Sequence, residues 1–330
     1  MNQESGSKDR ILTRVIIGVS VIGICYFGYR AISDNANVSQ YNPFEYDLDS
    51  FKNSDAALVH YSVVGQINVD MQHVSGIAID NNDNVYVTGD ASVLQYDAAG
   101  NLQSTVTTGE SAHCAAVDDN GDVYLCMRDH IVVYDGSGAV KARWDAVPDE
   151  PYITSIALSD EFVFVADAGN RIVWKFDKQG NRLMRIGEKN ADKEIPGFIV
   201  PSPYFDVQMD TDGFLWVVNP GRHSLENYTL DGDLRSSWGE YGMEIEGFCG
   251  CCNPTHITML DDGKFVTSEK GLARIKVYNR IGELVSIVAE VSEFPFGTIG
   301  LDLARDSHNR IYVVDQRHKA IRIYGKNQPL

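Results

Sequence analysis

Basic residues are scarce in this chain. Its 330 residues include 28 lysines and arginines against 46 aspartates and glutamates, which gives a formal net charge of −18 at pH 7. An acidic surface of this size repels the phosphate backbone of DNA and RNA. We therefore expect no nucleic acid among the partners.

Two catalytic signatures are absent as well. The sequence contains neither a Gly-rich phosphate loop nor a Ser, His and Asp order typical of nucleophilic hydrolases. No motif therefore assigns a reaction or catalytic residues. The sequence leaves open whether the chain is an enzyme.

Long apolar runs are confined to the N-terminus. Residues 15–29, VIIGVSVIGICYFGY, carry no charge, and Arg14 and Arg30 bracket them. About 20 apolar residues span a bilayer, so we predict a transmembrane anchor over residues 11–32. Basic residues are concentrated before this anchor, which favours residues 1–10 in the cytoplasm and the rest on the extracytoplasmic, periplasmic side. A cleaved signal peptide is the alternative, since the small residues of RAIS follow the apolar run.

The remainder divides into a linker and a repeated unit. Residues 33–56 are polar and acidic, which is typical of a tether. In residues 57–330, each unit has an apolar strand, a polar turn, a second strand such as NVYV and a third strand that ends in an aromatic residue. The second-strand aromatics recur every 38 to 52 residues, at Tyr86, Tyr124, Phe164, Trp216, Phe265 and Tyr312.

Six repeats of this length, with three or four strands each, predict an all-β, six-bladed β-propeller. Residues 57–67, ALVHYSVVGQI, are strand-like and precede the first unit. We expect them to supply the outer strand of the last blade and so close the ring, because closure removes open sheet edges.

Several segments resemble the NHL repeat family. SSWGEYGMEIEGFCGCCNPTHITM is similar to the NHL spacer, with a Trp-Gly, a second Gly, a Gly-Phe and a Pro that opens the next strand. VADAGNRIVWKFDKQGN and YVVDQRHKAIRIYG are similar to the second half of the repeat, and IVPSPYFDVQMD and WVVNPGRH resemble segments of uncharacterised, membrane-anchored bacterial NHL proteins. The resemblance covers nearly all of residues 57–326 and implies a propeller. It assigns no activity, because NHL propellers include enzymes, ligand binders and scaffolds.

The inner strands should all begin at one mouth of the central channel. The residue before the first buried apolar position is, unit by unit, Gly76, Cys114, Ser155, Asp206, His256 and Asp302. Cysteine, aspartate and histidine are metal ligands, and the C-x-C-C loop runs directly into the histidine. The candidate metal or redox set is Cys249, Cys251, Cys252, His256, Cys114, Asp206, Asp302 and His113, with Zn, Cu, Ca or an Fe–S cluster as candidate cofactors.

The cysteines have a second interpretation. Cys114 and Cys126 are equidistant from the turn between residues 117 and 123, so they would face each other across a hairpin and could form a disulfide in an exported domain. One pair within the C-x-C-C cluster could also close locally. Its spacing matches none of the common zinc or ferredoxin spacings. Disulfide and metal both remain open.

Long loops and basic side chains share the face that carries this mouth. Residues 195–203 and 247–256 lie in the two longest loops, and binding residues concentrate on such loops. The basic rim is predicted to comprise Arg128, His130, Arg222, His223, Lys270, Arg317 and His318. On an acidic protein these residues favour an anionic ligand or an acidic partner surface.

Two enzyme families resemble parts of this arrangement. Peptide-amidating lyases are NHL-type propellers that hold zinc with inner-strand histidines, and His113 and His256 are similar to that pattern, although a third such histidine is lacking. Lactonase-like propellers bind calcium through carboxylates and amides, which Asp206, Asp302 and Asn253 match incompletely.

We therefore expect a membrane-anchored, extracytoplasmic propeller that binds or scaffolds a protein partner within an envelope complex. The alternative is a metal-dependent enzyme of the lyase or lactonase type, or an electron-transfer subunit, with its metal or Fe–S centre at the channel mouth.

Overall fold

The computed structural model describes residue 26 and residues 54–295 and 297–327. Among these residues, no helix has both the length and the apolar character needed to cross a membrane. Apart from residue 26, the predicted anchor over residues 11–32 falls outside the described residues, and so does nearly all of the predicted linker. Both remain predictions.

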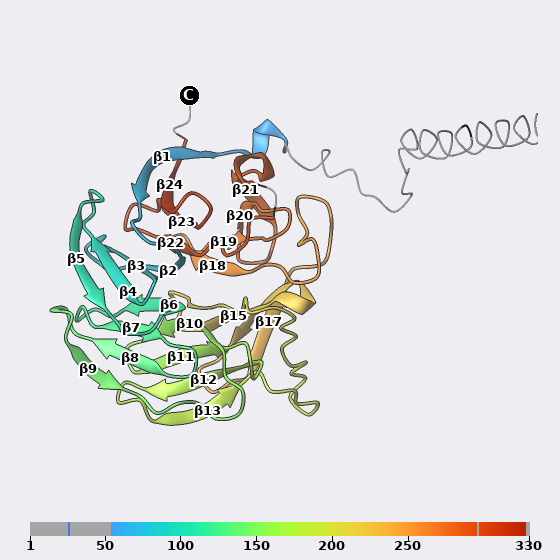
Figure 1. Cartoon of the computed structure of the whole chain (residues 1–330). Coiled ribbons are helices and arrows are strands. Elements are labelled where there is room, and N and C mark those ends of the chain that lie inside the picture. The colour runs from blue at the N-terminus through green and yellow to red at the C-terminus, as the bar shows by residue number, and fades with distance from the viewer. Residues whose placement is uncertain (1–25, 27–53, 296, 328–330) are drawn as a thin grey trace, which may run out of the picture. The chain divides into compact units, whose positions relative to one another are not determined.

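Six four-stranded antiparallel sheets are arranged around a common centre (Figure 1). This confirms the predicted six-bladed β-propeller. The strands of each blade are given from the innermost to the outermost. Blade 1 consists of β2 (Val74–Ile79), β3 (Val85–Gly89), β4 (Ser92–Tyr96) and β5 (Leu102–Thr107), and blade 2 of β6 (Cys114–Val117), β7 (Val123–Cys126), β8 (Ile131–Tyr134) and β9 (Val140–Arg143). Blade 3 consists of β10 (Ile153–Leu158), β11 (Phe162–Asp167), β12 (Ile172–Asp177) and β13 (Arg182–Ile186).

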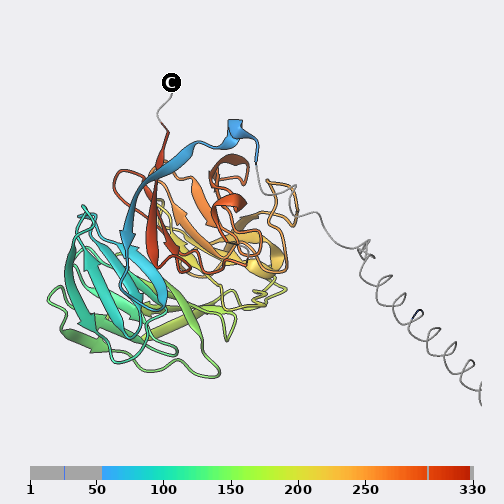
Figure 2. The same ribbon diagram turned by 45° about the horizontal axis from the view of Figure 1, so that its top comes forward.

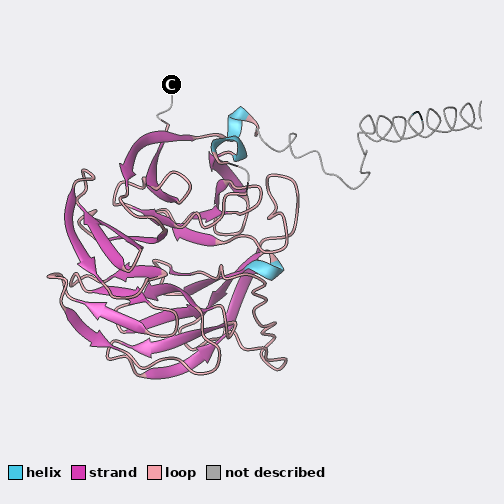
Figure 3. Ribbon diagram, viewed as in Figure 1, coloured by secondary structure: helices cyan, strands magenta, loops and turns pink. Residues whose placement is uncertain are grey.

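Blades 4 to 6 follow the same order. Blade 4 consists of β14 (Val207–Met209), β15 (Leu215–Asn219), β16 (Ser224–Tyr228) and β17 (Leu234–Trp238), and blade 5 of β18 (His256–Met259), β19 (Phe265–Ser268), β20 (Ile275–Tyr278) and β21 (Leu284–Ala289). Blade 6 consists of β22 (Leu303–Arg305), β23 (Ile311–Asp315), β24 (Ala320–Lys326) and β1 (Tyr61–Asn68). Figure 3 shows that strands dominate the described chain, with short 3-10 turns at η2 (Ala56–Leu58), η3 (Pro220–Arg222) and η4 (Val291–Glu293).

The ring closes through the sixth blade. Strand β1 pairs antiparallel with β24, with Ile67 opposite Ile321, and it is the outer strand of that sheet. Figure 2 shows the blue N-terminal strand beside the red C-terminal one. The expected closure by residues 57–67 is confirmed, and it ties the first strand of the propeller to the last.

Aromatic side chains fill the spaces between blades. Every second-strand aromatic is buried, as Tyr124, Phe164 and Tyr312 illustrate, and burying one such ring contributes about 2–3 kcal/mol. Several rings are also fixed by an aspartate six residues earlier: Trp216 Nε1 donates to Asp210 at 2.9 Å. That aspartate accepts backbone amides of the intervening turn as well. The polar turns therefore hold the ring as well as reverse the chain.

Gly76 lies where two inner strands approach closely. A Cβ atom at this position would lie 3.0 Å from the carbonyl oxygen of His113 and 3.2 Å from the Cα atom of Cys114. Only glycine fits this approach without displacing backbone. The inner strands of blades 1 and 2 therefore pack closely at the mouth. Blade 1 contributes only a glycine there, whereas blades 2 to 6 contribute side chains with polar atoms or sulfur.

Candidate functional site

Three side chains from different blades converge at the channel mouth. Asp206 directly precedes β14, His256 begins β18 and Asp302 precedes β22. His256 Nδ1 lies 3.3 Å from Asp302 Oδ1 and 3.7 Å from Asp206 Oδ2. One potential ligand atom from each of the three lies within 4.8 Å of the other two. The inner strands bring these residues together although 96 positions separate the outermost two.

Backbone amides orient both carboxylates. Asp206 accepts the amide of Val207 at 2.8 Å and the amide of Ile257 at 2.7 Å, and Ser155 Oγ donates to it as well. Asp206 therefore links the inner strands of blades 3, 4 and 5. Asp302 accepts the amide of Leu303 at 2.8 Å.

Asp302 also accepts the amide of Ile77 at 3.0 Å, which links blade 6 to blade 1. The two carboxylates are thus held rigidly, with the His256 imidazole between them.

Burial makes these carboxylates expensive to ionise. Burial raises the pKa of Asp206, His256 opposes the shift and Asp302 adds to it, which leaves the pKa at about 6. Burial likewise raises the pKa of Asp302, again opposed by His256. Buried carboxylates need a compensating positive charge. His256 opposes the shift at both carboxylates, and a divalent cation between them would supply two positive charges.

The donor set suits a cation. Carboxylate oxygen and imidazole nitrogen are ligands of Zn²⁺ and of related divalent ions, and a catalytic or binding site typically keeps one position for a water or a ligand. Asp206, His256 and Asp302 offer three protein ligands. The arrangement can therefore bind a divalent ion and still leave a position open.

Aromatic and basic side chains lie next to this centre. The Tyr204 ring packs edge-on against His256 with a centroid separation of 5.7 Å, and Lys270 Nζ lies 4.9 Å from the Tyr204 centroid. On the side of blades 2 and 3, Arg128 lies over the Tyr152 ring at 5.5 Å. Burial raises the pKa of Tyr204, and its interactions with Tyr152 and with Cys252 add to the shift. The Tyr204 phenol therefore remains protonated at neutral pH.

His113 is near the mouth but not in the centre. Its ring packs against Tyr152 with a centroid separation of 5.0 Å. Burial lowers the pKa of His113, and the neighbouring Arg128 lowers it further. This histidine is therefore neutral at pH 7 and is absent from the group of converging ligands.

A cavity of about 390 Å³ extends from the mouth along the channel. Asp206 and Asp302 line one end, and Asp83 and Asp306 line the other. A second group of converging ligands, Asp83, Asp306 and His308, lies at that opposite end. Its Asp306 already pairs with Arg310, so it resembles an internal ion pair more closely than an open site.

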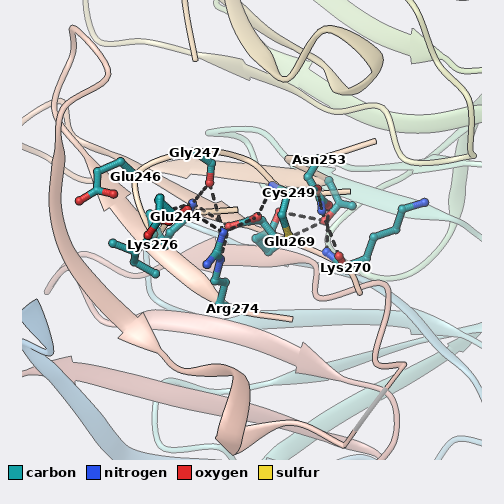
Figure 4. A network of polar contacts seen from close by, with 12 residues as sticks. Glu244, Glu246, Gly247, Cys249, Asn253, Glu269, Lys270, Arg274 and Lys276 are labelled. Atoms are coloured by element: carbon teal, nitrogen blue, oxygen red, sulfur yellow. Dashed lines mark hydrogen bonds and ion pairs between the residues drawn. The ribbon is translucent and has the colours of Figure 1, made fainter. Parts of the chain in front are cut away.

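The three clustered cysteines have different surroundings. Figure 4 shows Cys249 beside a buried network in which Glu269 pairs with Arg274 at 2.8 Å and with Lys276 at 2.7 Å. Both cations also donate to the carbonyl of Gly247 and so anchor the loop. Burial raises the pKa of the Cys249 thiol to about 11, and Glu269 contributes to the shift. Cys249 is therefore an inert, protonated thiol.

The other four cysteines among the described residues divide into two pairs. Cys114 and Cys126 lie opposite each other on β6 and β7, with Cα atoms 5.1 Å apart, and are joined in a disulfide. Because the Cys114 sulfur is bonded to Cys126, it is not available as the metal ligand that the sequence predicts. Cys251 and Cys252 place their sulfur atoms 3.1 Å apart. In the described part of the chain, neither group of converging ligands includes a cysteine.

The basic rim residues are mostly engaged with neighbours. His130 contacts Asp129 at 2.7 Å, His318 contacts the buried Asp315 at 2.8 Å, and Arg222 donates to the Gly197 carbonyl at 3.3 Å. His223 packs against the exposed Tyr241. These contacts show that the predicted rim is built partly from structural ion pairs and caps.

The remaining rim residues have other neighbours. Lys270 lies over Tyr204, which packs against His256, and Arg128 lies over Tyr152. Arg317 lies near Gly297: a Cβ atom added to that glycine would be 3.9 Å from the Arg317 guanidinium.

Sequence reasoning missed several residues that shape the mouth. Ser155 occupies an aligned entry position, but its hydrogen bond to Asp206 depends on the spacing between blades. Tyr204 precedes the aspartate by two residues and carries no repeat signature. A signal did exist for Lys276, because a lysine in the apolar third strand IKVY breaks the pattern of buried positions and so calls for a buried partner.

Comparisons with known proteins agree on the fold. The family model of the SBBP β-propeller repeat matches residues 65–93, and no curated protein is significantly similar. A streptogramin B lyase structure is 12% identical, covers 81% of this chain and 98% of its own, and has a TM-score of 0.59. Virginiamycin B lyase from Staphylococcus aureus is 12% identical, with coverages of 80% and 99% and a TM-score of 0.57.

A protein of unknown function from Bacteroides thetaiotaomicron is 17% identical, covers 81% of this chain and 75% of its own, and has a TM-score of 0.59. At these identities the similarity shows the β-propeller fold alone.

Proposed function

We propose that this protein is a membrane-anchored, extracytoplasmic propeller of the NHL type that binds its ligand through a divalent cation at the channel mouth. The observation that carries the proposal is the convergence of Asp206, His256 and Asp302, whose potential ligand atoms lie within 4.8 Å of one another. The apolar run at residues 15–29 supports the anchor, and the NHL-like spacer segments support the family.

The ligand is anionic. A divalent ion with three protein ligands has a coordination position for a carboxylate or phosphate oxygen. Lys270, packed over Tyr204 beside the centre, adds positive charge there, and Arg128, packed over Tyr152, adds positive charge on the side of blades 2 and 3. The surrounding loops, residues 195–203 and 247–256, would then contact the rest of the partner. An acidic segment of another envelope protein meets these requirements.

Metal analysis tests the proposal. The purified full-length chain is treated with a chelator, dialysed, and titrated by calorimetry with Zn²⁺, Ca²⁺ or Mn²⁺. We expect one site per chain, and we expect His256→Gln and Asp302→Asn to abolish it. His308→Gln is the matched control, because it changes a histidine beside two aspartates at the opposite end of the channel. Absence of a site in the parent chain, or loss of the site only in His308→Gln, would contradict the proposal.

A metal-dependent enzyme is the second candidate function. The observation that favours it is the protonated Tyr204 phenol next to His256, since a phenol held beside a metal can donate a proton to a leaving group. Tyr204→Phe separates the two functions. Under the binding proposal it leaves affinity for an acidic peptide nearly unchanged, whereas an enzyme would lose turnover of its substrate while retaining the ion.

A further inference from the structure

Cys251 and Cys252 are adjacent in sequence and close in space. Their Sγ atoms lie 3.1 Å apart, about 1 Å more than a disulfide bond length. The Cys251 thiol is exposed, whereas Cys252 is only 1% exposed. One sulfur can therefore be reached from solvent, and the second lies directly behind it.

The environment of Cys252 stabilises a thiolate. Lys270 and Ser202 both act on its sulfur to lower the pKa of Cys252, and Lys270 Nζ donates to Ser202 Oγ at 2.7 Å. Burial raises the pKa of Cys252, but the interactions with Lys270, Ser202 and Cys251 outweigh burial and leave the pKa below its ordinary value. By contrast, the hydrogen bond and the charge of Cys252 raise the pKa of Cys251. The two thiols are chemically unequal, as in other reactive cysteine pairs.

The neighbouring Cys249 cannot take part in the same way. It is buried, its amide donates to Glu269 at 3.2 Å, and its carbonyl accepts from Asn253 at 2.7 Å. Its thiol pKa is raised to about 11, chiefly by burial. The cluster therefore holds one closely spaced pair and one sequestered thiol.

We propose that Cys251 and Cys252 form a redox-active dithiol, which exchanges with an external disulfide at the exposed Cys251 and closes to a vicinal disulfide through attack by Cys252. This activity is independent of the proposed cation site. Its substrates are thiols and disulfides that can reach an exposed sulfur on the loop face of the propeller.

The exchange balances in two steps. Cys251, as its thiolate, attacks the external disulfide, forms a mixed disulfide and releases one thiolate, which takes up the Cys251 proton through water. The Cys252 thiolate then attacks Cys251 Sγ, forms the Cys251–Cys252 bond and displaces the second external thiolate. The protein loses two electrons and the Cys251 proton, and the external disulfide gains both electrons. Because Cys252 reacts as a thiolate, the second external thiolate takes its proton from water, so two external thiols are released. Lys270 holds the attacking sulfur as a thiolate in the second step.

Thiol mapping in redox buffers tests this proposal directly. The full-length chain is reduced, equilibrated with graded ratios of reduced to oxidised glutathione, quenched with acid, alkylated, digested and analysed by mass spectrometry. We expect the peptide that contains the C-x-C-C cluster to lose two hydrogens in one two-electron transition, with Cys249 alkylated throughout. Three alkylated cysteines at every ratio, or an oxidised pair that includes Cys249, would overturn the proposal.

Variants test the order of the steps. Cys252→Ser should accumulate glutathione on Cys251, and Cys251→Ser should take up none, because Cys252 is buried. Lys270→Met should slow release of glutathione from the mixed disulfide by about threefold or more. Without the lysine, a smaller fraction of Cys252 is thiolate, and the higher nucleophilicity of that thiolate offsets the loss only in part. Lys189→Met, which changes an exposed lysine on a nearby loop, is the matched control. Glutathione uptake by Cys251→Ser, or equal release rates in Lys270→Met and the parent, would contradict the assigned roles.

Discussion

His256 Nδ1 lies 3.3 Å from Asp302 Oδ1, which joins the inner strand of blade 5 to that of blade 6 at the channel mouth. Asp302 in turn accepts the amide of Ile77 from blade 1. This contact therefore belongs both to the closure of the ring and to the candidate cation centre. Changes here are expected to affect stability and ion binding together, and experiments must separate the two.

Cation binding should stabilise the folded protein. At a free Zn²⁺ concentration 100 times Kd, binding to the native state alone adds about 2.7 kcal/mol to the free energy of unfolding. We expect this gain in the parent chain and in His308→Gln, but not in His256→Gln. Thermal unfolding with and without the ion measures it. Equal gains in both histidine variants would place the ion elsewhere.

Without the ion, stability should fall as the pH rises through the range in which Asp206 ionises. Burial raises its folded-state pKa to about 6, above the ordinary value of about 3.9 in the unfolded chain. Between these values the folded protein holds more protons than the unfolded chain, so the free energy of unfolding decreases with pH, by up to about 3 kcal/mol in total. The raised pKa of Asp302 acts in the same direction.

Asp206→Asn isolates this contribution. Its side chain stays neutral, so the difference in unfolding free energy between the parent and the variant should shift against the parent as the pH rises from about 4 to about 7. Urea unfolding in the presence of a chelator, at several pH values, measures the difference. A difference that stays constant with pH, or shifts in favour of the parent, would show that Asp206 is not the buried titrating group.

The buried network around Glu269 should respond unequally to its two obvious variants. It contains one carboxylate and two cations, all nearly inaccessible. Glu269→Gln would leave Arg274 and Lys276 without their counter-charge, at a cost of about 3–5 kcal/mol. Lys276→Met would leave a matched Glu269–Arg274 pair and lose mainly the hydrogen bonds to the Ile245 and Gly247 carbonyls, at a cost of about 1–3 kcal/mol. Urea unfolding of both variants checks the order, and a more damaging Lys276→Met would contradict it.

The sequence predicted the features that the repeat itself imposes. Aromatics such as Tyr86 and Tyr312 mark each second strand, so their spacing was sufficient to count the blades. The same symmetry placed Asp206, His256 and Asp302 at equivalent strand starts, and equivalent positions of a closed ring face a common axis. Their convergence followed from the repeat alone.

Contacts that depend on unequal loops could not be predicted in this way. Cys249 and Cys252 are three residues apart, yet one packs beside Glu269 and the other beside Lys270. Which neighbour each cysteine contacts depends on how the loop folds back onto β19 and β20, and no repeat signature specifies the path of that loop. The residue type of His318 favours a ligand-binding rim, and its contact with Asp315 in its own hairpin is a local detail that the residue type does not specify.

The Cys114–Cys126 disulfide should contribute modestly to stability. It closes a short hairpin, since 12 positions separate the two residues, and the chain-entropy model gives about 3 kcal/mol for a loop of that length. We expect the double variant Cys114→Ala/Cys126→Ala to fold and to lose about 2–3 kcal/mol in urea unfolding, because β6 and β7 remain paired along their full length. The matched comparison is the parent chain under reducing conditions, which should lose a similar amount. A loss in the double variant with none on reduction of the parent would mean that packing of the two side chains, rather than the bond, stabilises the hairpin.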